Sequence, residues 1–286
     1  MAFLGGILGQ TVFVIFSLTV LYYFYQYLFA YTGQGSKLVL NGTMSANPTN
    51  ALVSSVTDKA NAIPAIYEGG EYSVNIWVYI NDWSTRRGYN KHIVSIGGND
   101  FLTFALYLKP FTNALAVTVR TTDLSTTPAS GSVSQATSTP NAGDLLTGAG
   151  VQTLFNSASS MPQDITTTPP CDIPSIDLQK WVQVTLTLNN KTSDVYIDGK
   201  LARSCVLPSF YRVSKTGSVS MKICDFGGFG GYVSNATAFN YTLNPEQVWQ
   251  HYMKGPGPQY SFTDYWNGLF NPTSINTNYP KMNIVG

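Results

Sequence analysis

Charged residues are scarce in this chain of 286 residues. Lysine, arginine, aspartate and glutamate make up only 11% of it, against about 25% in ordinary soluble proteins. The formal net charge of +1 provides no basic surface for a phosphate backbone, so we expect no nucleic-acid partner. Serine, threonine, asparagine and glycine take the place of charge. Such a composition is typical of proteins that pack into assemblies or carry glycans.

Glutamates are too few and too badly placed for sugar hydrolysis. There are three: Glu68, Glu71 and Glu246. Glycosidases need two carboxylates about 5–5.5 Å apart for retention or about 6.5–9.5 Å apart for inversion, and no aspartate lies between Glu68 and Glu71. Glu246 opens an expected helix, where a carboxylate interacts favourably with the helix dipole. We therefore expect no catalytic residue and no enzyme activity.

Histidine is equally rare. His92 falls in an expected strand and His251 in an expected helix, and no serine–histidine–aspartate or metal-binding pattern surrounds either. Both are assigned structural roles. Asp100, Asp198 and Asp225 are conceivable Ca²⁺ ligands, but their glycine-containing surroundings favour turn formation. We expect no metal and no cofactor.

Cysteine is limited to Cys171, Cys205 and Cys224. An odd count leaves at least one of them without a partner inside the chain. Cys205 ends an expected strand that either of the others can reach. We favour a Cys171–Cys205 disulfide over Cys205–Cys224, with three buried thiols in a reducing compartment as the alternative. The chain has no CxxC pair, which excludes the usual zinc and redox motifs.

Residues 1–36 carry no charge at all. Within them, Thr11–Ala30 is an apolar and aromatic run of roughly 20 residues, which is long enough to cross a bilayer as a helix. We therefore expect residues 1–36 to form an N-terminal transmembrane anchor in membrane lipid. A cleaved signal peptide is the alternative, but the basic start and the small-residue cleavage site of such peptides are missing. Neither flank has a Lys/Arg cluster, so the orientation stays open.

The rest of the chain divides into a stalk (37–70), a domain (71–255) and an extended aromatic tail (256–286). The domain is interrupted at 121–170 by a Ser/Thr/Pro-rich insertion without an apolar period. Its strands are expected at 72–80, 92–96, 101–108, 114–120, 182–188, 195–197, 217–224 and 233–239. Many short strands with Gly/Asn turns between them predict an all-β sandwich.

The hairpin that starts at Trp181 is the clearest of these signals. Apolar and polar residues alternate through 182–188, which is the period of a half-buried strand. Residues 189–193 supply turn chemistry before the return strand. A short helix is expected late in the domain, because Asn244 is a good N-cap and Pro245 suits a first helical turn.

Three segments carry a resemblance to a known family. They read INDW at 80–83, VYIDGKLARSCVLP at 195–208, and GGFGGYVSN followed by YTLNPEQVW within 227–249. They resemble the concanavalin A-like jelly roll of the laminin-G type. They are more similar still to membrane-anchored minor capsid proteins of large icosahedral DNA viruses, such as those that infect algae. The resemblance implies a two-sheet sandwich with a short C-terminal helix, preceded by one N-terminal transmembrane helix.

The same resemblance implies a non-enzymatic structural role. The chain would be a single-pass membrane protein of the virion, placed between an internal membrane and the capsid and bound to other capsid proteins. The alternative is a membrane-anchored lectin or adhesion protein that binds glycans. The resemblance covers about 72–255 and leaves the insertion and the tail unmatched.

Two surface features complete the set of candidate sites. One loop gathers Trp83, Arg86, Arg87 and Lys91, which we interpret as a contact for a partner or for lipid headgroups, with a solvated loop as the alternative. Glycosylation sequons begin at Asn41, Asn190, Asn235 and Asn240. Asn190, at an expected hairpin tip, is the best placed of the four.

Overall fold

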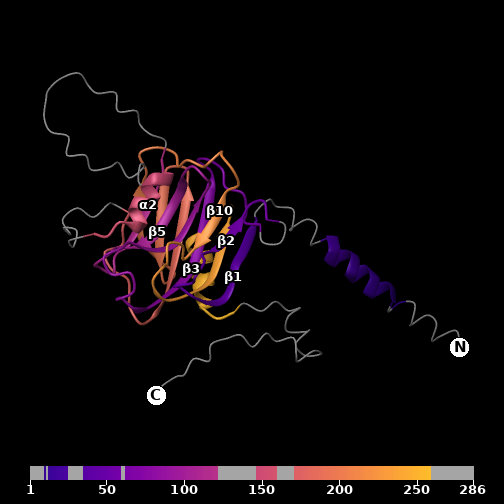
Figure 1. Ribbon diagram of the computed structural model, residues 1–286. Coiled ribbons are helices and arrows are strands. Elements are labelled where there is room, and N and C mark those ends of the chain that lie inside the picture. Colours follow the sequence, from indigo (N-terminus) through magenta and orange to yellow (C-terminus); the bar gives the residue numbers. More distant parts are fainter. Residues whose placement is uncertain are drawn as a thin grey trace, which may run out of the picture. The chain divides into compact units, whose positions relative to one another are not determined.

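The computed structural model describes residues 10, 12–24, 35–58, 62–121, 146–159 and 171–258. The chain forms two units, Met1–Gly35 and Ser36–Gly286. In the first unit, residues 12–24 are helical (Figure 1). No helix among the described residues is both long enough and apolar enough to span a membrane. The rest of the predicted 11–30 span lies outside the described residues.

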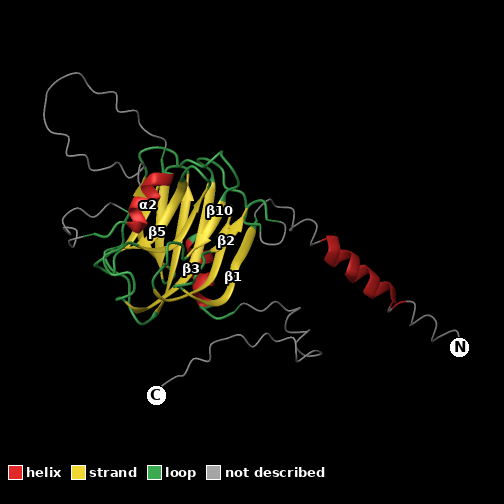
Figure 2. Cartoon of the chain, in the orientation of Figure 1, coloured by secondary structure: helices red, strands yellow, loops and turns green. Residues whose placement is uncertain are grey.

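The second unit is a sandwich of two antiparallel sheets, which confirms the predicted all-β architecture (Figures 1 and 2). The six-stranded sheet has the order β1 (Ser36–Ser45), β11 (Gly230–Phe239), β3 (Glu71–Asp82), β7 (Trp181–Asn189), β8 (Thr192–Ile197), β9 (Lys200–Val206). The five-stranded sheet has the order β2 (Leu52–Ser55), β10 (Ser220–Ile223), β4 (Lys91–Gly97), β5 (Leu102–Leu108), β6 (Leu115–Val119).

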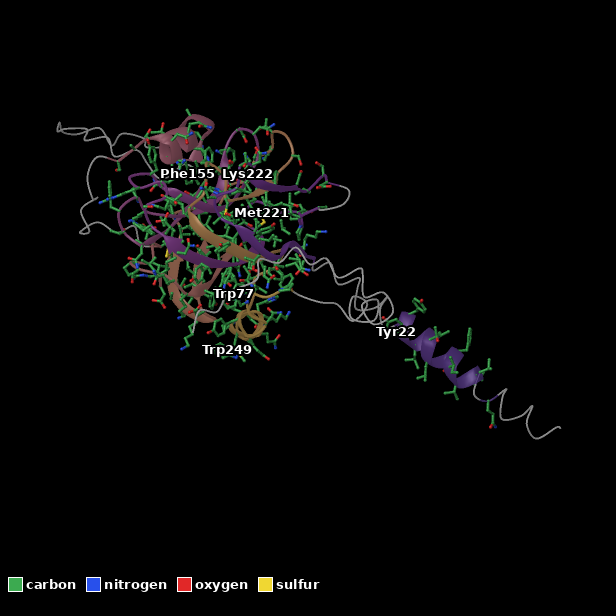
Figure 3. All side chains as sticks on the ribbon, turned by 60° about the horizontal axis from the view of Figure 1, so that its bottom comes forward. Tyr22, Trp77, Phe155, Met221, Lys222 and Trp249 are labelled. Carbon is green, nitrogen blue, oxygen red and sulfur yellow. A yellow bond between two sulfur atoms is a disulfide. The ribbon has the colours of Figure 1, made fainter. Side chains whose placement is uncertain are left out.

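The core lies between the two sheets and follows from the period-two alternation. In the β3–β7 pair, Val74 lies opposite Leu186 and Ile76 opposite Val184, and all four side chains are buried. Met221 of β10 belongs to the same cluster and lies between the layers in Figure 3. Burial contributes roughly 1.5–3 kcal/mol for each such side chain, so the alternation fixes which face of each strand points inward.

The hairpin turns form where the sequence supplies residues that tolerate positive φ. Asn189 pairs with Thr192 across the β7–β8 turn, and Asn190 at its tip has φ 52°. Asp198 and Gly199, at φ 49° and 77°, close the turn between β8 and β9. Asparagine, aspartate and glycine are the residues that adopt this region at the lowest cost.

The boundary of the predicted stalk (37–70) is corrected by the strand pairing. β1 pairs with β11 and β2 pairs with β10, so this segment supplies an edge strand to each sheet. The sandwich therefore begins at Ser36, not at residue 71. β1 is interrupted by register shifts between Leu38 and Thr43, which break the regular alternation of its side chains between the two faces.

Two helices cover the outer faces of the sheets. Helix α2 (Gly148–Asn156), part of the 121–170 insertion, packs on β5 and β6. Helix α3 (Pro245–Met253), the predicted C-terminal helix, packs on the six-stranded sheet. In Figure 3, Phe155 of α2 and Trp249 of α3 lie on opposite sides of the sandwich. Of the predicted tail, only 256–258 belong to the described residues.

Candidate functional site

Helix α3 forms one wall of the candidate site and is fixed at both ends. At its start, Asn244 and Gln247 exchange side-chain-to-backbone hydrogen bonds of 2.8 and 2.9 Å, a capping box of the kind that stabilises a helix by about 1 kcal/mol. Toward its end, Tyr252 stacks on Trp77 of β3 with ring centroids 5.6 Å apart. Figure 3 shows Trp77 close to this helix.

The close approach of α3 to the sheet requires a glycine in the β8–β9 turn. A Cβ atom on Gly199 would lie 2.7 Å from the Trp249 ring and 3.1 Å from Tyr252. Any other residue there would have to displace the side chains of Trp249 and Tyr252, and the positive φ adds backbone strain for any L side chain. The Asp198–Gly199 turn therefore both connects β8 to β9 and leaves room for α3 to pack close to the sheet.

A pocket of about 200 Å³ opens between the outer face of the six-stranded sheet and the C-terminal end of α3. We call it the α3 pocket. Strands β1, β3 and β11 and the helix end all contribute to it, and its principal side chains are Ser36, Asn75, Trp77, Thr237, His251 and Lys254. It combines aromatic and polar groups, the composition usual in ligand sites.

Several polar atoms of the α3 pocket lack partners. The Asn75 side chain is 3% exposed, and its oxygen accepts a hydrogen bond from Thr185 at 3.4 Å. Within the described residues, no hydrogen bond uses the Asn75 Nδ2, the Thr237 Oγ1 or the ring nitrogens of His251. Thr237 and His251 are only partly buried, so these atoms are open to the pocket and can form hydrogen bonds with a ligand in place of water.

His251 is uncharged at neutral pH in this setting. Burial, followed by the positive charge of Lys254, lowers the pKa of His251 to about 4. Its ring packs edge-on against Phe239 with a centroid distance of 5.0 Å. A neutral imidazole has one donor and one acceptor nitrogen, so His251 can bind groups of either kind.

An aromatic row continues along the same outer face. Tyr79, two residues beyond Trp77 on β3, lies between Trp181 of β7 and Tyr232 of β11, with centroid distances of 5.4 and 6.3 Å. Tyr232 is exposed, and the other two are half-buried. Strand register produces the row, because Tyr79 is directly paired with both neighbours.

The structure brings His92 and Ser95 together, an arrangement reminiscent of a base and a nucleophile. His92 Nε2 lies 2.9 Å from Ser95 Oγ, and its Nδ1 accepts a hydrogen bond from the backbone N–H of Asp225 at 3.1 Å. A neutral ring that accepts at Nδ1 carries its proton on Nε2 and donates it to the serine. A general base needs the opposite tautomer, so this pair is arranged as a structural hydrogen bond.

Helix α2 closes over this pair. Phe155 stacks on Phe226 with centroids 4.9 Å apart and lies 5.1 Å from the His92 ring. His92 is fully buried, and desolvation holds its pKa below the ordinary value, with Asp225 opposing and Lys222 reinforcing the shift. Arg86 and Asn90 donate to the carbonyls of Phe155 and Leu154 at the end of the helix. The cluster therefore anchors the insertion to the sheet.

The predicted contact loop is largely engaged inside the molecule. Lys91 is 0% exposed, donates to the carbonyl of Pro110 at 3.2 Å, and lies 4.3 Å from the Trp83 ring centroid. Arg86 is bound to the end of α2. Arg87 is the exposed cation of the set, so a partner contact at this loop stays a prediction for Arg87.

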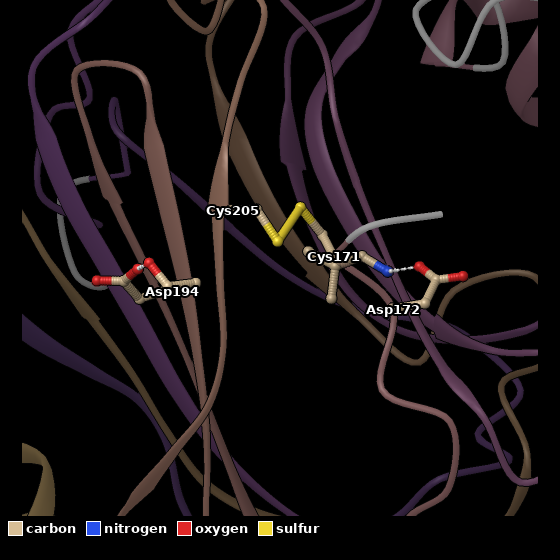
Figure 4. The surroundings of a disulfide bond; sticks show 6 residues. Cys171, Asp172, Asp194 and Cys205 are labelled. Carbon is tan, nitrogen blue, oxygen red and sulfur yellow. Dashed lines mark hydrogen bonds between the residues drawn. A yellow bond between two sulfur atoms is a disulfide. The ribbon is translucent and has the colours of Figure 1, made fainter. Parts of the chain in front are cut away.

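Cys171 and Cys205 form a disulfide, with Cα atoms 5.6 Å apart (Figure 4). Both cysteines are buried, and the bond ties β9 to the segment that follows the insertion. Next to it, Asp172 accepts from the N–H of Val117 and pairs with Lys109 at 2.9 Å. Cys224 is a buried free thiol, and burial raises its pKa.

The three aspartates considered as Ca²⁺ ligands are separated and occupied. The carboxylates of Asp100, Asp198 and Asp225 each accept a backbone N–H, from Phe101, Gln183 and Phe226 respectively. Two of them also pair with lysines, Asp198 with Lys180 and Asp225 with Lys222. Within the described residues, no group of three or more His, Cys, Asp or Glu side chains could hold a metal ion.

The glycosylation sequons differ in how accessible their asparagines are. Asn190 is exposed at the hairpin tip. Asn235 is 5% exposed, its oxygen accepts from Gly42 N–H, and its nitrogen donates to Gly255 O. When the chain is routed through a eukaryotic secretory pathway, we expect a glycan on Asn190 and none on Asn235, by glycopeptide mass spectrometry. Asn190→Gln should remove that glycan, whereas modification of Asn235 would contradict this geometry.

Sequence reasoning missed the α3 pocket and the aromatic row. One signal was present: Asn75, Trp77 and Tyr79 alternate with Val74, Ile76 and Val78 of the core and so share the outer face of β3. The residues that complete the pocket come from β1, β11 and α3, far away in the sequence. Which of them face Trp77 depends on strand order, and local patterns do not reveal strand order.

Comparisons with known proteins give limited similarity. No family model and no curated protein sequence matches the chain. Among solved structures, the binding domain of botulinum neurotoxin serotype G is 16% identical over 78% of this chain, with a TM-score of 0.41. The receptor-binding domain of botulinum neurotoxin D is 12% identical over 77%, with a TM-score of 0.44. The chain spans less than half of each of these structures, 47% and 48%. The assignment of a two-sheet sandwich therefore stands on the strand pairing itself.

Proposed function

We propose that this chain is a non-enzymatic structural protein, tethered to a membrane by its N-terminal helix and contacting neighbouring proteins through its sandwich. In its specific form, the proposal follows the sequence resemblance: a laminin-G-like minor capsid component that links an internal membrane to a capsid shell. Its localisation would be the virion, between membrane and capsid.

The single observation that carries the proposal is the surface of the helix at 12–24. Every large apolar side chain on it is exposed, from 50% at Val20 to 71% at Phe13. A helix that is apolar all round requires a lipid or protein environment. Removing each such side chain from water is worth roughly 1.5–3 kcal/mol, which together makes a strong driving force for insertion.

The sandwich is suited to act as a docking block. Its core is continuous between the sheets, and the disulfide braces one edge. That edge strand, β9, exposes Leu201 at 55% and Val206 at 81%. Apolar side chains at the edge of a rigid, weakly charged sheet suit close packing against a neighbouring subunit.

Flotation with lipid vesicles tests the tether. The full chain should rise with the vesicles in a density gradient. The double variant Ile15→Lys/Leu18→Lys should stay with the soluble fraction, because each lysine at the centre of a membrane helix costs roughly 2.5–3.5 kcal/mol. Val206→Lys, the same kind of change on the sandwich, serves as the matched control and should float. A double variant that floats like the unmodified chain would rule out the tether.

The composition of purified virions tests the assignment as a minor capsid component. If the chain is a minor capsid component, cross-linking mass spectrometry of purified virions should recover links from the sandwich to capsid subunits. Virions that lack the chain would overturn the capsid assignment and leave the tether untouched.

A further inference from the structure

We propose that the α3 pocket binds one sugar ring, as the terminal residue of a glycan. The inference goes beyond the structural role above and is independent of the tether. It rests on the size of the pocket and on the polar groups that line it.

The size limits the ligand to a single ring. Pockets for drug-sized ligands measure roughly 300–1,000 Å³, and the α3 pocket measures about 200 Å³. At about 30 Å³ for each water, that volume corresponds to roughly six or seven waters. A ligand that displaces them must return their hydrogen bonds, because losing those bonds lowers affinity.

The polar groups match a ligand with hydroxyls around its whole edge. Asn75 and Thr237 contribute from the sheet, His251 from the helix, and Ser36 from the edge strand β1. Hydroxyl and neutral imidazole groups both donate and accept, as sugar hydroxyls do. At neutral pH the lowered pKa of His251 keeps its acceptor nitrogen free.

The walls favour a sugar over a phosphate. Lys254 is the one cation that lines the pocket within the described residues, and His251 beside it is neutral. A phosphate is normally held by several donors, such as an arginine fork or a helix N-terminus, and here the helix presents its C-terminal end. Trp77 and Phe239 also line the pocket, but they are only 4% and 2% exposed and the Trp77 ring is already stacked on Tyr252, so the ligand would be held by polar contacts around its edge.

The test uses the full chain in detergent micelles and saturation-transfer NMR. The probes are methyl glucoside, methyl galactoside, N-acetylglucosamine and glucuronic acid, each at millimolar concentration. Saturation should reach the ring protons of at least one sugar, and titration should give its dissociation constant. Absence of transfer to all four would overturn the proposal, whatever the flotation result.

Two variants locate the site. Ser36 and Ser45 are exposed serines at opposite ends of β1, and only Ser36 lines the pocket. Ser36→Trp should obstruct the pocket and weaken binding about tenfold or more, and Thr237→Val should weaken it about tenfold through one lost hydrogen bond. Ser45→Trp is the matched control and should bind like the unmodified chain. Each variant should keep its melting temperature within a few degrees. Equal binding by Ser36→Trp and Ser45→Trp would contradict the pocket as the site.

Discussion

Cys171→Ser should lower the free energy of unfolding by about 4 kcal/mol under oxidising conditions. The disulfide closes a loop with a sequence separation of 34 residues, and the chain-entropy estimate for such a loop is about 4 kcal/mol, within the 2–5 kcal/mol typical of native disulfides. Cys205→Ser should have the same effect, since either change removes the same constraint. Urea unfolding followed by intrinsic tryptophan fluorescence gives the comparison.

The control is the third cysteine. Cys224→Ala removes a buried free thiol and should cost only about 1 kcal/mol as a small loss of packing. Reductant should destabilise the unmodified chain and the Cys224→Ala variant equally, and should leave Cys171→Ser unchanged. A disulfide-linked peptide that contains Cys224, or a chain indifferent to reductant, would show that another pairing or three thiols prevail.

Sequence patterns predict the position of a strand best where one of its faces is continuously buried. The alternation at 182–188 located β7 within one residue, because Val182 to Leu188 supply one inward side chain at every second position. The cap at Asn244 located the start of α3 for a similarly local reason. Both signals arise within a few residues of chain and do not depend on what lies across the core.

Features made by distant residues were not predictable in this way. The predicted stalk at 37–70 includes β1, an edge strand with irregular burial and two register shifts. His92 and Ser95 are three residues apart, which in a regular strand puts them on opposite faces. A register shift between His92 and Val94 places both on the outer face, and such a bulge is visible only in the pairing.

Acid should destabilise the sandwich well before its carboxylates titrate, and His92 should be a main cause. Its folded pKa lies below the unfolded value of 6.5, so between these values the unfolded chain binds more protons than the folded one. The contribution of His92 to stability is therefore fully present above pH 6.5. It is lost as the pH falls from 6.5 toward the folded pKa. A full proton difference corresponds to about 1.4 kcal/mol per pH unit, and we expect roughly that loss from His92 between pH 6 and pH 5.

Two variants separate this contribution from that of His251, which shifts in the same direction. His92→Phe should cost about 1–3 kcal/mol at pH 7, because the N–H of Asp225 and the hydroxyl of Ser95 lose their partner. It should also flatten the pH dependence, since the buried proton acceptor is gone. His251→Gln should leave most of the slope in place, because His251 is only partly buried and solvent weakens its contribution. If His92→Phe keeps the full pH dependence of the free energy of unfolding between pH 6 and pH 5, measured by urea unfolding, the acid sensitivity does not come from His92.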